Sequence, residues 1–180
     1  MSRAGDRDVR RTVDVVVTFL EMPEPGRLPA GQPLPGDVRL QRETPPAASA
    51  LSSSLYRRVG GPWHWTDRLS WNHSDWVEAI DRPDVEVWTA RIGEEIAGYF
   101  ELQRIDDAVD IRYFGLVPEQ TGRGLGGPLL ERAVRRAWEM GPRRVTVNTC
   151  TLDHPAALPN YLARGFVVVR TESQQRRISA

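Results

Sequence analysis

Residues 118–130 read Pro-Glu-Gln-Thr-Gly-Arg-Gly-Leu-Gly-Gly-Pro-Leu-Leu, with four glycines among the six positions 122–127. The β-branched and aromatic run 109–117 precedes them and predicts a strand. Apolar residues then recur along one face of 125–140, which predicts a helix whose first turn accommodates Pro128. Glycine lets backbone N–H groups approach a ligand, and a helix N-terminus carries a partial positive charge. The stretch therefore predicts a seat for a phosphate or diphosphate.

The surrounding hydrophobic pattern predicts the rest of the fold. Strands are expected at 13–22, 38–43, 85–91, 96–103, 143–149 and 166–170, and further helices at 45–59, 76–80 and 155–164. Thr44 is expected to cap the helix at 45–59, and Gly93 to turn a β-hairpin. Strands that follow one another and then alternate with helices predict an α/β fold of mixed type, with helices on the faces of one sheet.

Composition excludes several classes of protein. The 24 basic residues balance 24 acidic ones, which argues against a general nucleic-acid binder. Every basic residue is Arg, so a phosphate-binding loop lysine, a Schiff-base lysine and a pyridoxal-phosphate anchor are all excluded. One cysteine and three widely spaced histidines predict neither a disulfide nor a metal site. With no signal-type or 18-residue apolar segment, a cytoplasmic location away from membranes is expected.

A dinucleotide site is the other interpretation of the glycines. Gly122, Gly124 and Gly127 satisfy the spacing G-x-G-x-x-G. In dinucleotide-binding folds, however, this motif follows its strand directly and further βαβ units come after it. Here residues 118–121 intervene, and too few residues follow Gly127 to build those units, which disfavours this interpretation.

On these residues the sequence resembles the GNAT superfamily of N-acetyltransferases. The diphosphate motif of that family is Gln/Arg-x-x-Gly-x-Gly/Ala, and residues 121–126, Thr-Gly-Arg-Gly-Leu-Gly, take its place with Thr121 at the first position. Residues 161–166, Tyr-Leu-Ala-Arg-Gly-Phe, resemble the family's Tyr-x-x-x-Gly-Phe ending. His154 stands where that family often has Asn. The similarity extends over about residues 85–170.

The resemblance implies a mostly antiparallel sheet of six to seven strands, splayed in the middle. It also implies acetyl-CoA as cosubstrate, without a metal. The contacts with coenzyme A that it implies are Leu116, Val117, Pro118, Thr121, Gly122, Arg123, Gly124, Leu125, Gly126, Gly127, His154 and Asn160. Gly115 suits a bulge and close approach of a ligand, or a relief of strand twist.

One domain is expected for a chain of this length. Within it, residues 1–12 are expected to form a disordered tail. Residues 13–44 would comprise a strand, a proline-rich loop and the first core strand, and 45–180 the acetyltransferase domain.

Acetyl transfer to an amine needs a base for the ammonium group and an acid for the leaving thiolate. Tyr161 matches the general acid of the family, or else is a core tyrosine. Asp110, at a position that some members use, and Glu101, on an apolar strand, are the candidate bases. Strict alternation would place Asp110, Arg112 and Phe114 on one face, so a solvent-facing Asp110 stays an alternative.

The acceptor side is less clearly marked. Residues 61–76 hold four of the six tryptophans, which would line a pocket or fasten a loop. Arg57, Arg58 and Arg68 could bind an acidic acceptor or be solvated, and Cys150 is expected to be structural. These features predict an N-acetyltransferase acting on a primary amine of a small molecule or an amino-acid-like acceptor. A protein or peptide N-acetyltransferase and a non-catalytic acyl-CoA-binding module are the alternatives, and a homodimer paired through the first strand is a further possibility.

Overall fold

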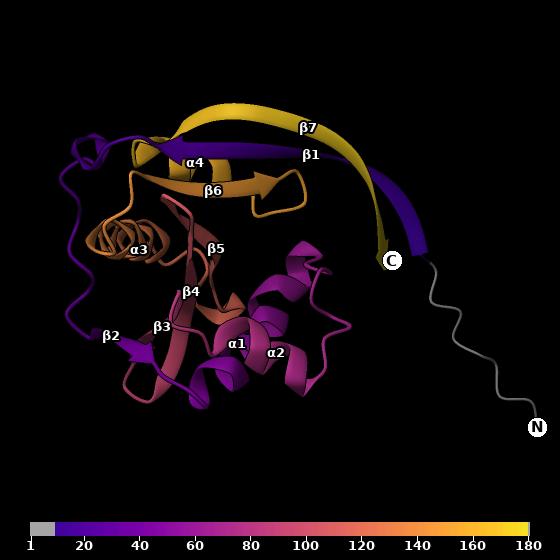
Figure 1. The fold of residues 1–180 in the computed structure, drawn as a ribbon, viewed down its shortest axis with the longest axis horizontal. Coiled ribbons are helices and arrows are strands. Elements are labelled where there is room, and N and C mark those ends of the chain that lie inside the picture. Colours follow the sequence, from indigo (N-terminus) through magenta and orange to yellow (C-terminus); the bar gives the residue numbers. More distant parts are fainter. Residues whose placement is uncertain (1–9, 180) are drawn as a thin grey trace, which may run out of the picture.

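The computed structural model describes residues 10–179, and most of the expected tail, residues 1–9, lies outside the described residues. Strands and helices follow in the order that the sequence predicts (Figure 1). The strands are β1 (Arg10–Met22), β2 (Val38–Glu43), β3 (Val85–Ile92), β4 (Glu95–Ile105), β5 (Ala108–Leu116), β6 (Arg144–Cys150) and β7 (Val167–Ser179). The helices are α1 (Ala47–Gly60), α2 (His73–Ile80), α3 (Gly126–Glu139) and α4 (Ala157–Ala163).

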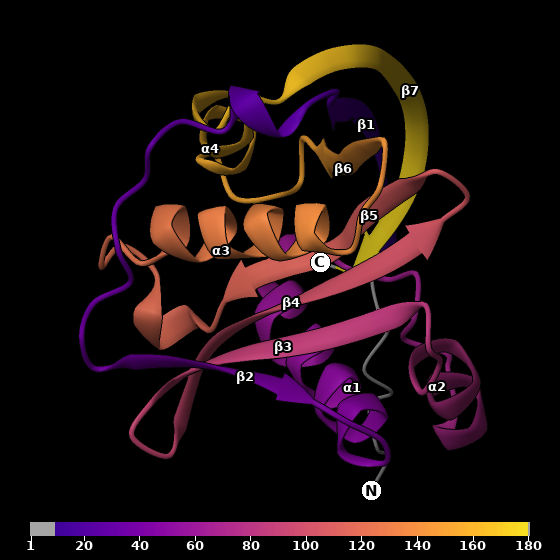
Figure 2. The ribbon, with the colours of Figure 1, turned by 60° about the vertical axis from the view of Figure 1, so that its left-hand side comes forward.

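All seven strands form one sheet in the order β2-β3-β4-β5-β6-β1-β7. Every neighbouring pair is antiparallel except β5 and β6, which run parallel. Figure 2 shows β2–β5 and β6, β1 and β7 as two halves of this twisted sheet. The predicted mixed, mostly antiparallel sheet is confirmed, and the first strand in the sequence lies between the last two in space.

Two apolar clusters show which helices cover which face. Phe100 and Leu102 of β4 belong to the cluster formed with α3, whereas Tyr99, the residue before Phe100, belongs to the cluster formed with α1 and α2. Successive strand residues point to opposite faces, so the two helix pairs lie on opposite sides of the sheet. Tyr161 of α4 packs in the α3 cluster, which places α4 on the α3 side.

Three local expectations were wrong. Residues 10–12 belong to β1 rather than to a tail. Thr44 does not cap α1, because the helix begins after Pro46 without a side-chain cap. The last strand does not end at residue 170 but continues to Ser179. Its polar second half has no apolar alternation to reveal it, and it is a strand because it pairs with residues 10–16 of β1.

A β-bulge at Arg112 breaks the strict alternation expected for β5. Glu101 pairs with Tyr113, whereas the next residue of β4, Leu102, pairs with Ile111. Arg112 is thus the extra residue of the strand. As a result, Ile111 and Phe114 both pack on the α3 side, while Tyr113 packs on the α1–α2 side. The expectation that Asp110, Arg112 and Phe114 share a face was therefore wrong.

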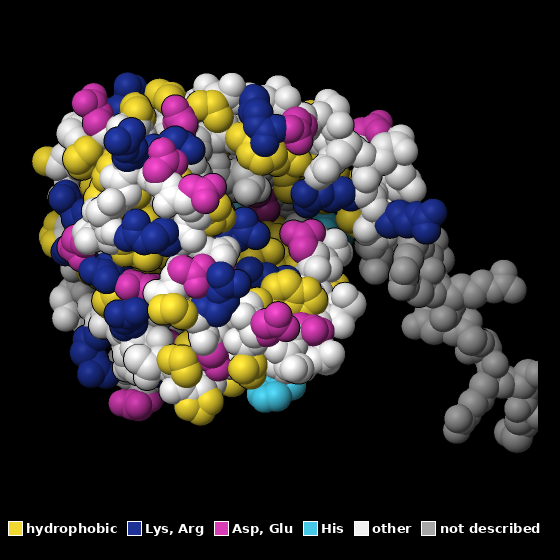
Figure 3. Space-filling view, in the orientation of Figure 1, with side chains coloured by type: hydrophobic (Ala, Val, Ile, Leu, Met, Phe, Trp, Pro, Cys, Tyr) yellow, Lys and Arg dark blue, Asp and Glu magenta, His cyan; other side chains and the backbone are white. Residues whose placement is uncertain are grey.

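The surface and the helices add two observations. On the face shown in Figure 3, arginines and acidic side chains are interspersed, with no patch of a single sign. No helix within residues 10–179 is long and apolar enough to cross a lipid bilayer.

Candidate active site

The parallel pair β5–β6 opens into a gap. Its register covers only four positions, from Ala108 opposite Arg144 to Ile111 opposite Val147. Beyond these positions both strands continue, β5 to Leu116 and β6 to Cys150, but they no longer pair with each other. A cavity of about 610 Å³ lies at this opening. The expected splay in the middle of the sheet is thus present, and this cavity lies at it.

The cavity passes through the sheet from one face to the other. Tyr161, which packs on the α3–α4 side, lines it. Trp65 and Tyr113, which pack with the α1–α2 cluster, line it as well. Two reactants can therefore enter from opposite faces and meet in the gap.

The glycine-rich segment forms one wall of the cavity. Gly122 and Gly124 have φ values of 79° and 78°, a left-handed conformation that favours glycine. They lead into α3, whose first intrahelical bond runs from the Leu129 amide to the Leu125 carbonyl. The amides of Gly126 and Gly127 precede that bond and are free to donate to an anion. The donor set fits a diphosphate.

Arg164 is a functional candidate that the sequence analysis missed. It follows α4, and its guanidinium lies so close to Gly127 that a β-carbon at this position would overlap Nη2. A second cavity of about 480 Å³ contacts Arg164, Gly124, Gly127 and the segment 29–32 of the proline-rich loop. A cation beside the N-terminus of α3 strengthens its attraction for phosphate. Its position just before Gly165, in the Tyr-x-x-x-Gly-Phe ending, was the only signal in the sequence.

The predicted coenzyme contacts divide into two groups. Those that line the first cavity are Leu116, Thr121, Gly122, Gly124, Gly126, Gly127, His154 and Asn160. Val117, Pro118, Arg123 and Leu125 are not part of its lining. Val117 is buried in the α1–α2 cluster, and its amide donates to the carbonyl of Ala97 at 3.0 Å. Its backbone is therefore already engaged by β4. Gly115 lines the cavity and lies against Val59 of α1, so close packing explains this glycine.

Tyr161 is 6% exposed and faces the cavity. Burial, with added repulsion from the charges of Asp153 and Asp110, raises the pKa of its phenol above the usual value. The hydroxyl therefore keeps its proton at neutral pH and is available as a donor. This protonation state suits a general acid.

Asp110 lies at the point where β5 and β6 separate. It is 8% exposed, it accepts a hydrogen bond from Thr146 at 2.6 Å, and Arg112 lies 3.3 Å away. Burial raises the pKa of this carboxyl, although both partners oppose the shift. Its neighbours Ile111 and Arg112 line the cavity. Asp110 is thus buried behind the wall of the cavity, which excludes a solvent-facing position.

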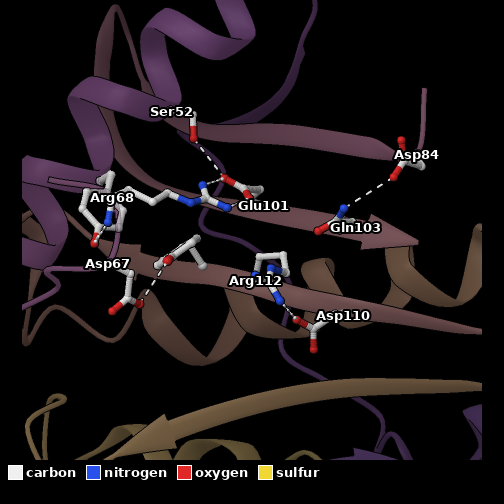
Figure 4. Close-up of polar contacts among 10 residues, drawn as sticks. Ser52, Asp67, Arg68, Asp84, Glu101, Gln103, Asp110 and Arg112 are labelled. Carbon is white, nitrogen blue, oxygen red and sulfur yellow. Dashed lines mark hydrogen bonds and ion pairs between the residues drawn. The ribbon is translucent and has the colours of Figure 1, made fainter. Parts of the chain in front are cut away.

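Glu101 is not brought to the cavity. It is 1% exposed, and its two oxygens accept hydrogen bonds from Arg68 at 2.8 Å each (Figure 4). Ser52 of α1 donates a third, at 3.0 Å. A carboxylate held in this way has no path to a substrate proton. The suggestion that Glu101 is the base therefore has no support in the geometry, and Arg68, at 5% exposed, is unavailable to an acidic acceptor.

The tryptophan-rich segment 61–76 serves both purposes expected for it. Trp63 and Trp65 line the cavity, and the indole N–H of Trp65 donates to Asp153 at 3.2 Å. Trp71 and Trp76 instead pack around the Arg68 guanidinium, 4.6 and 5.4 Å from their ring centres. One pair forms the wall and the other fastens the segment to the core.

His154 and Cys150 also line the cavity. The ring of His154 packs edge-on against Trp63, and its Nδ1 accepts a hydrogen bond from the amide of Ala156 at 3.0 Å. A neutral imidazole in this arrangement carries its proton on Nε2. Burial raises the pKa of the Cys150 thiol, so it stays protonated. Within residues 10–179, no group of three or more His, Cys, Asp or Glu side chains could hold a metal ion.

Comparisons with known proteins agree on the fold. A GCN5-related N-acetyltransferase from Sphaerobacter thermophilus superposes with a TM-score of 0.69 at 16% identity, over 95% of this chain and 54% of that one. One from Kribbella flavida gives 0.63 at 18% identity, over 93% and 60%. This chain thus spans little more than half the length of either.

A shorter protein also shares the fold. An aminoglycoside acetyltransferase from an uncultured soil metagenomic sample, in complex with sisomicin, gives a TM-score of 0.56 at 13% identity, over 71% of this chain and 86% of that one. No curated protein matched the sequence. A family model described as the Acetyltransferase (GNAT) family matches residues 50–166. Because that match covers well over half of the chain, this protein belongs to the acetyltransferase (GNAT) family.

Proposed function

We propose that this protein transfers the acetyl group of acetyl-CoA directly to a primary amine of a small molecule. One observation carries the proposal: a single cavity joins the glycine-rich start of α3 to an aromatic wall on the other face of the sheet, with Tyr161 in its lining. The first wall suits a diphosphate and the second suits an amine. Both reactants can then be bound together, and no covalent enzyme intermediate is needed.

The coenzyme would lie along the α3 side. The amides of Gly126 and Gly127, with Arg164 beside them, would hold its diphosphate. The unpaired edges of β5 and β6 would accept its extended arm between them. Segment 29–32, which borders the second cavity, would cover the nucleotide end.

Tyr161 and Asp110 would move the two protons. The amine nitrogen attacks the thioester carbonyl, the carbon–sulfur bond breaks, and the leaving thiolate takes the phenol proton of Tyr161. The nitrogen of the new amide then gives up its extra proton, which restores the phenol. Asp110, acting through water, would accept the proton that the attacking ammonium must lose. The indoles of Trp63 and Trp65 would exclude bulk water and restrict the acceptor to a small molecule.

The test is an assay of free thiol release from acetyl-CoA with a panel of small amines, amino acids and peptides. We expect turnover with small amines, and Tyr161→Phe to lower kcat roughly 100-fold while calorimetry finds unchanged coenzyme A affinity. Turnover of peptides alone would support the protein-acetyltransferase alternative. Coenzyme A binding without thiol release for any acceptor would support a non-catalytic module.

A further inference from the structure

Arg176 of β7 is a cation in the cavity that no carboxylate of the described residues neutralises. Four residues with formal charges line the cavity, namely Asp67, Arg112, Asp153 and Arg176. Arg112 pairs with Asp110. Asp153 already accepts three hydrogen bonds, from the Trp65 indole, the Thr149 hydroxyl and the Cys150 amide. Arg112 and Asp153 are therefore already engaged in contacts within the walls of the cavity.

Arg176 is bound on one side only. Its Nη1 lies 3.8 Å from the sulfur of Cys150, which is also in the lining. The side-chain amide of Gln174 is oriented so that its oxygen faces Arg176. This oxygen accepts hydrogen bonds from Nη2 and Nε of Arg176 at 2.7 and 2.8 Å. A guanidinium has five N–H donors, so donors beside Cys150 remain for a ligand. A half-buried guanidinium in this state favours an anion.

The overall charge of the lining indicates what kind of anion. Because Arg112 is paired with Asp110 and Asp153 is engaged in the walls, Asp67 and Arg176 remain as one charge of each sign in the lining, so a ligand carrying one charge of each sign suits the cavity better than a polycation. Asp67 is exposed, and the Tyr113 hydroxyl lies 3.5 Å from its Oδ2. This carboxylate can attract an ammonium group. One guanidinium, without a second unpaired arginine beside it, matches the single charge of a carboxylate.

We infer that the amine acceptor also bears a carboxylate, and that Arg176 binds this carboxylate. The inference rests on the proposed function and narrows its acceptor to amino-acid-like zwitterions. Arg176 determines specificity and takes no part in proton transfer.

Matched pairs of acceptors test the inference, with L-phenylalanine against phenethylamine and L-alanine against ethylamine. We expect kcat/KM to be roughly ten to a hundredfold higher for the amino acid of a pair, in line with a charge-assisted hydrogen bond. Arg176→Gln should lower kcat/KM for the amino acid of each pair to about that for the simple amine and so abolish the preference. Arg177→Gln, at the exposed neighbouring position, is the matched control and should retain the preference.

Binding of N-acetylphenylalanine to the protein saturated with coenzyme A provides a readout that does not need turnover. Calorimetry should show that Arg176→Gln weakens this binding at least tenfold, while the affinity for coenzyme A is unchanged. Equal kcat/KM for both members of each pair would overturn the inference and leave the proposed function standing. The same holds if Arg176→Gln does not change the affinity for N-acetylphenylalanine. Failure of coenzyme A itself to bind would instead overturn the proposed function.

Discussion

At the scale of single residues, burial shifts the pKa of both groups that we propose for proton transfer. Tyr161 stays protonated because its environment disfavours the phenolate. In Asp110 the same effect disfavours the carboxylate, which makes it a stronger proton acceptor than an exposed aspartate. Burial raises both pKa values, but the consequences differ: Tyr161 is kept as a proton donor, and Asp110 becomes a better proton acceptor.

The raised pKa of Asp110 predicts how stability depends on pH. In the window between the pKa of the unfolded chain and the raised native value, the native state binds more protons, so stability falls as pH rises. Asp110→Asn removes this titration and can keep the contact with Thr146. Relative to the wild type, the variant should therefore gain stability as pH is raised from about 4 to 7.

Urea denaturation at a series of pH values measures the effect. Asp37→Asn, at an exposed position in the loop before β2, is the control and should follow the wild type. A difference between Asp110→Asn and wild type that does not change with pH would contradict the shift.

The buried Arg68–Glu101 pair predicts a strong and non-additive loss of stability. Arg68→Met leaves the Glu101 carboxylate buried without its partner, which should cost on the order of 3–5 kcal/mol. The double variant Arg68→Met, Glu101→Met removes both charges and should recover most of that loss. Urea denaturation of the single and double variants measures the coupling. A loss in the double variant equal to the sum of the losses in Arg68→Met and Glu101→Met would show that the two residues are not coupled.

At the scale of elements, the loop before α3 depends on left-handed glycines. Gly124→Ala should cost about 1–2 kcal/mol of stability and displace the amides that precede α3, so coenzyme A affinity should fall. Gly141, at the other end of the helix, has a similar φ of 75° and open space around it. Gly141→Ala is the matched control, since it should lose similar stability without affecting the coenzyme.

Calorimetry with coenzyme A and thermal unfolding separate the two effects. If both variants lose affinity equally, general destabilisation would explain the result and the loop would have no specific role. If neither loses affinity, the diphosphate does not depend on this loop.

At the scale of the whole molecule, one part of β1 has a neighbouring strand on each side and the other part has a neighbour on one side only. Residues 17–21 of β1 pair with both β6 and β7, whereas residues 10–16 pair with no other strand than β7. Figure 1 shows this two-stranded ribbon curving away from the rest of the sheet. A ribbon of two strands is only marginally stable by itself. The part of β7 that carries Arg176 belongs to it.

Hydrogen exchange followed by mass spectrometry should reveal this difference. Amides in 10–16 and 173–179 should exchange faster than those in 17–22 and 144–150, because the ribbon can open without unfolding the sheet. Equal protection across β1 would mean that further contacts hold the ribbon in place.

Local patterns in the sequence predicted much of the fold and drew attention to the residues that we propose to contact coenzyme A. The order of elements, the glycine-rich start of α3 and Tyr161 all follow from periodicity and short motifs. Such features depend on neighbours within a few residues, since turn glycines and amphipathic faces act locally. That is why they are visible without a structure.

Only the tertiary structure decided which side chains come together around the cavity. Glu101 could be recognised as buried, but its partner Arg68 is 33 positions away and lies in a loop without periodicity. The bulge at Arg112 changes which side chains of β5 face each side of the sheet. Pairing with β1 holds the polar residues around Arg176 in a strand. These outcomes depend on pairing between distant segments, whose free energy has no local signature in the chain.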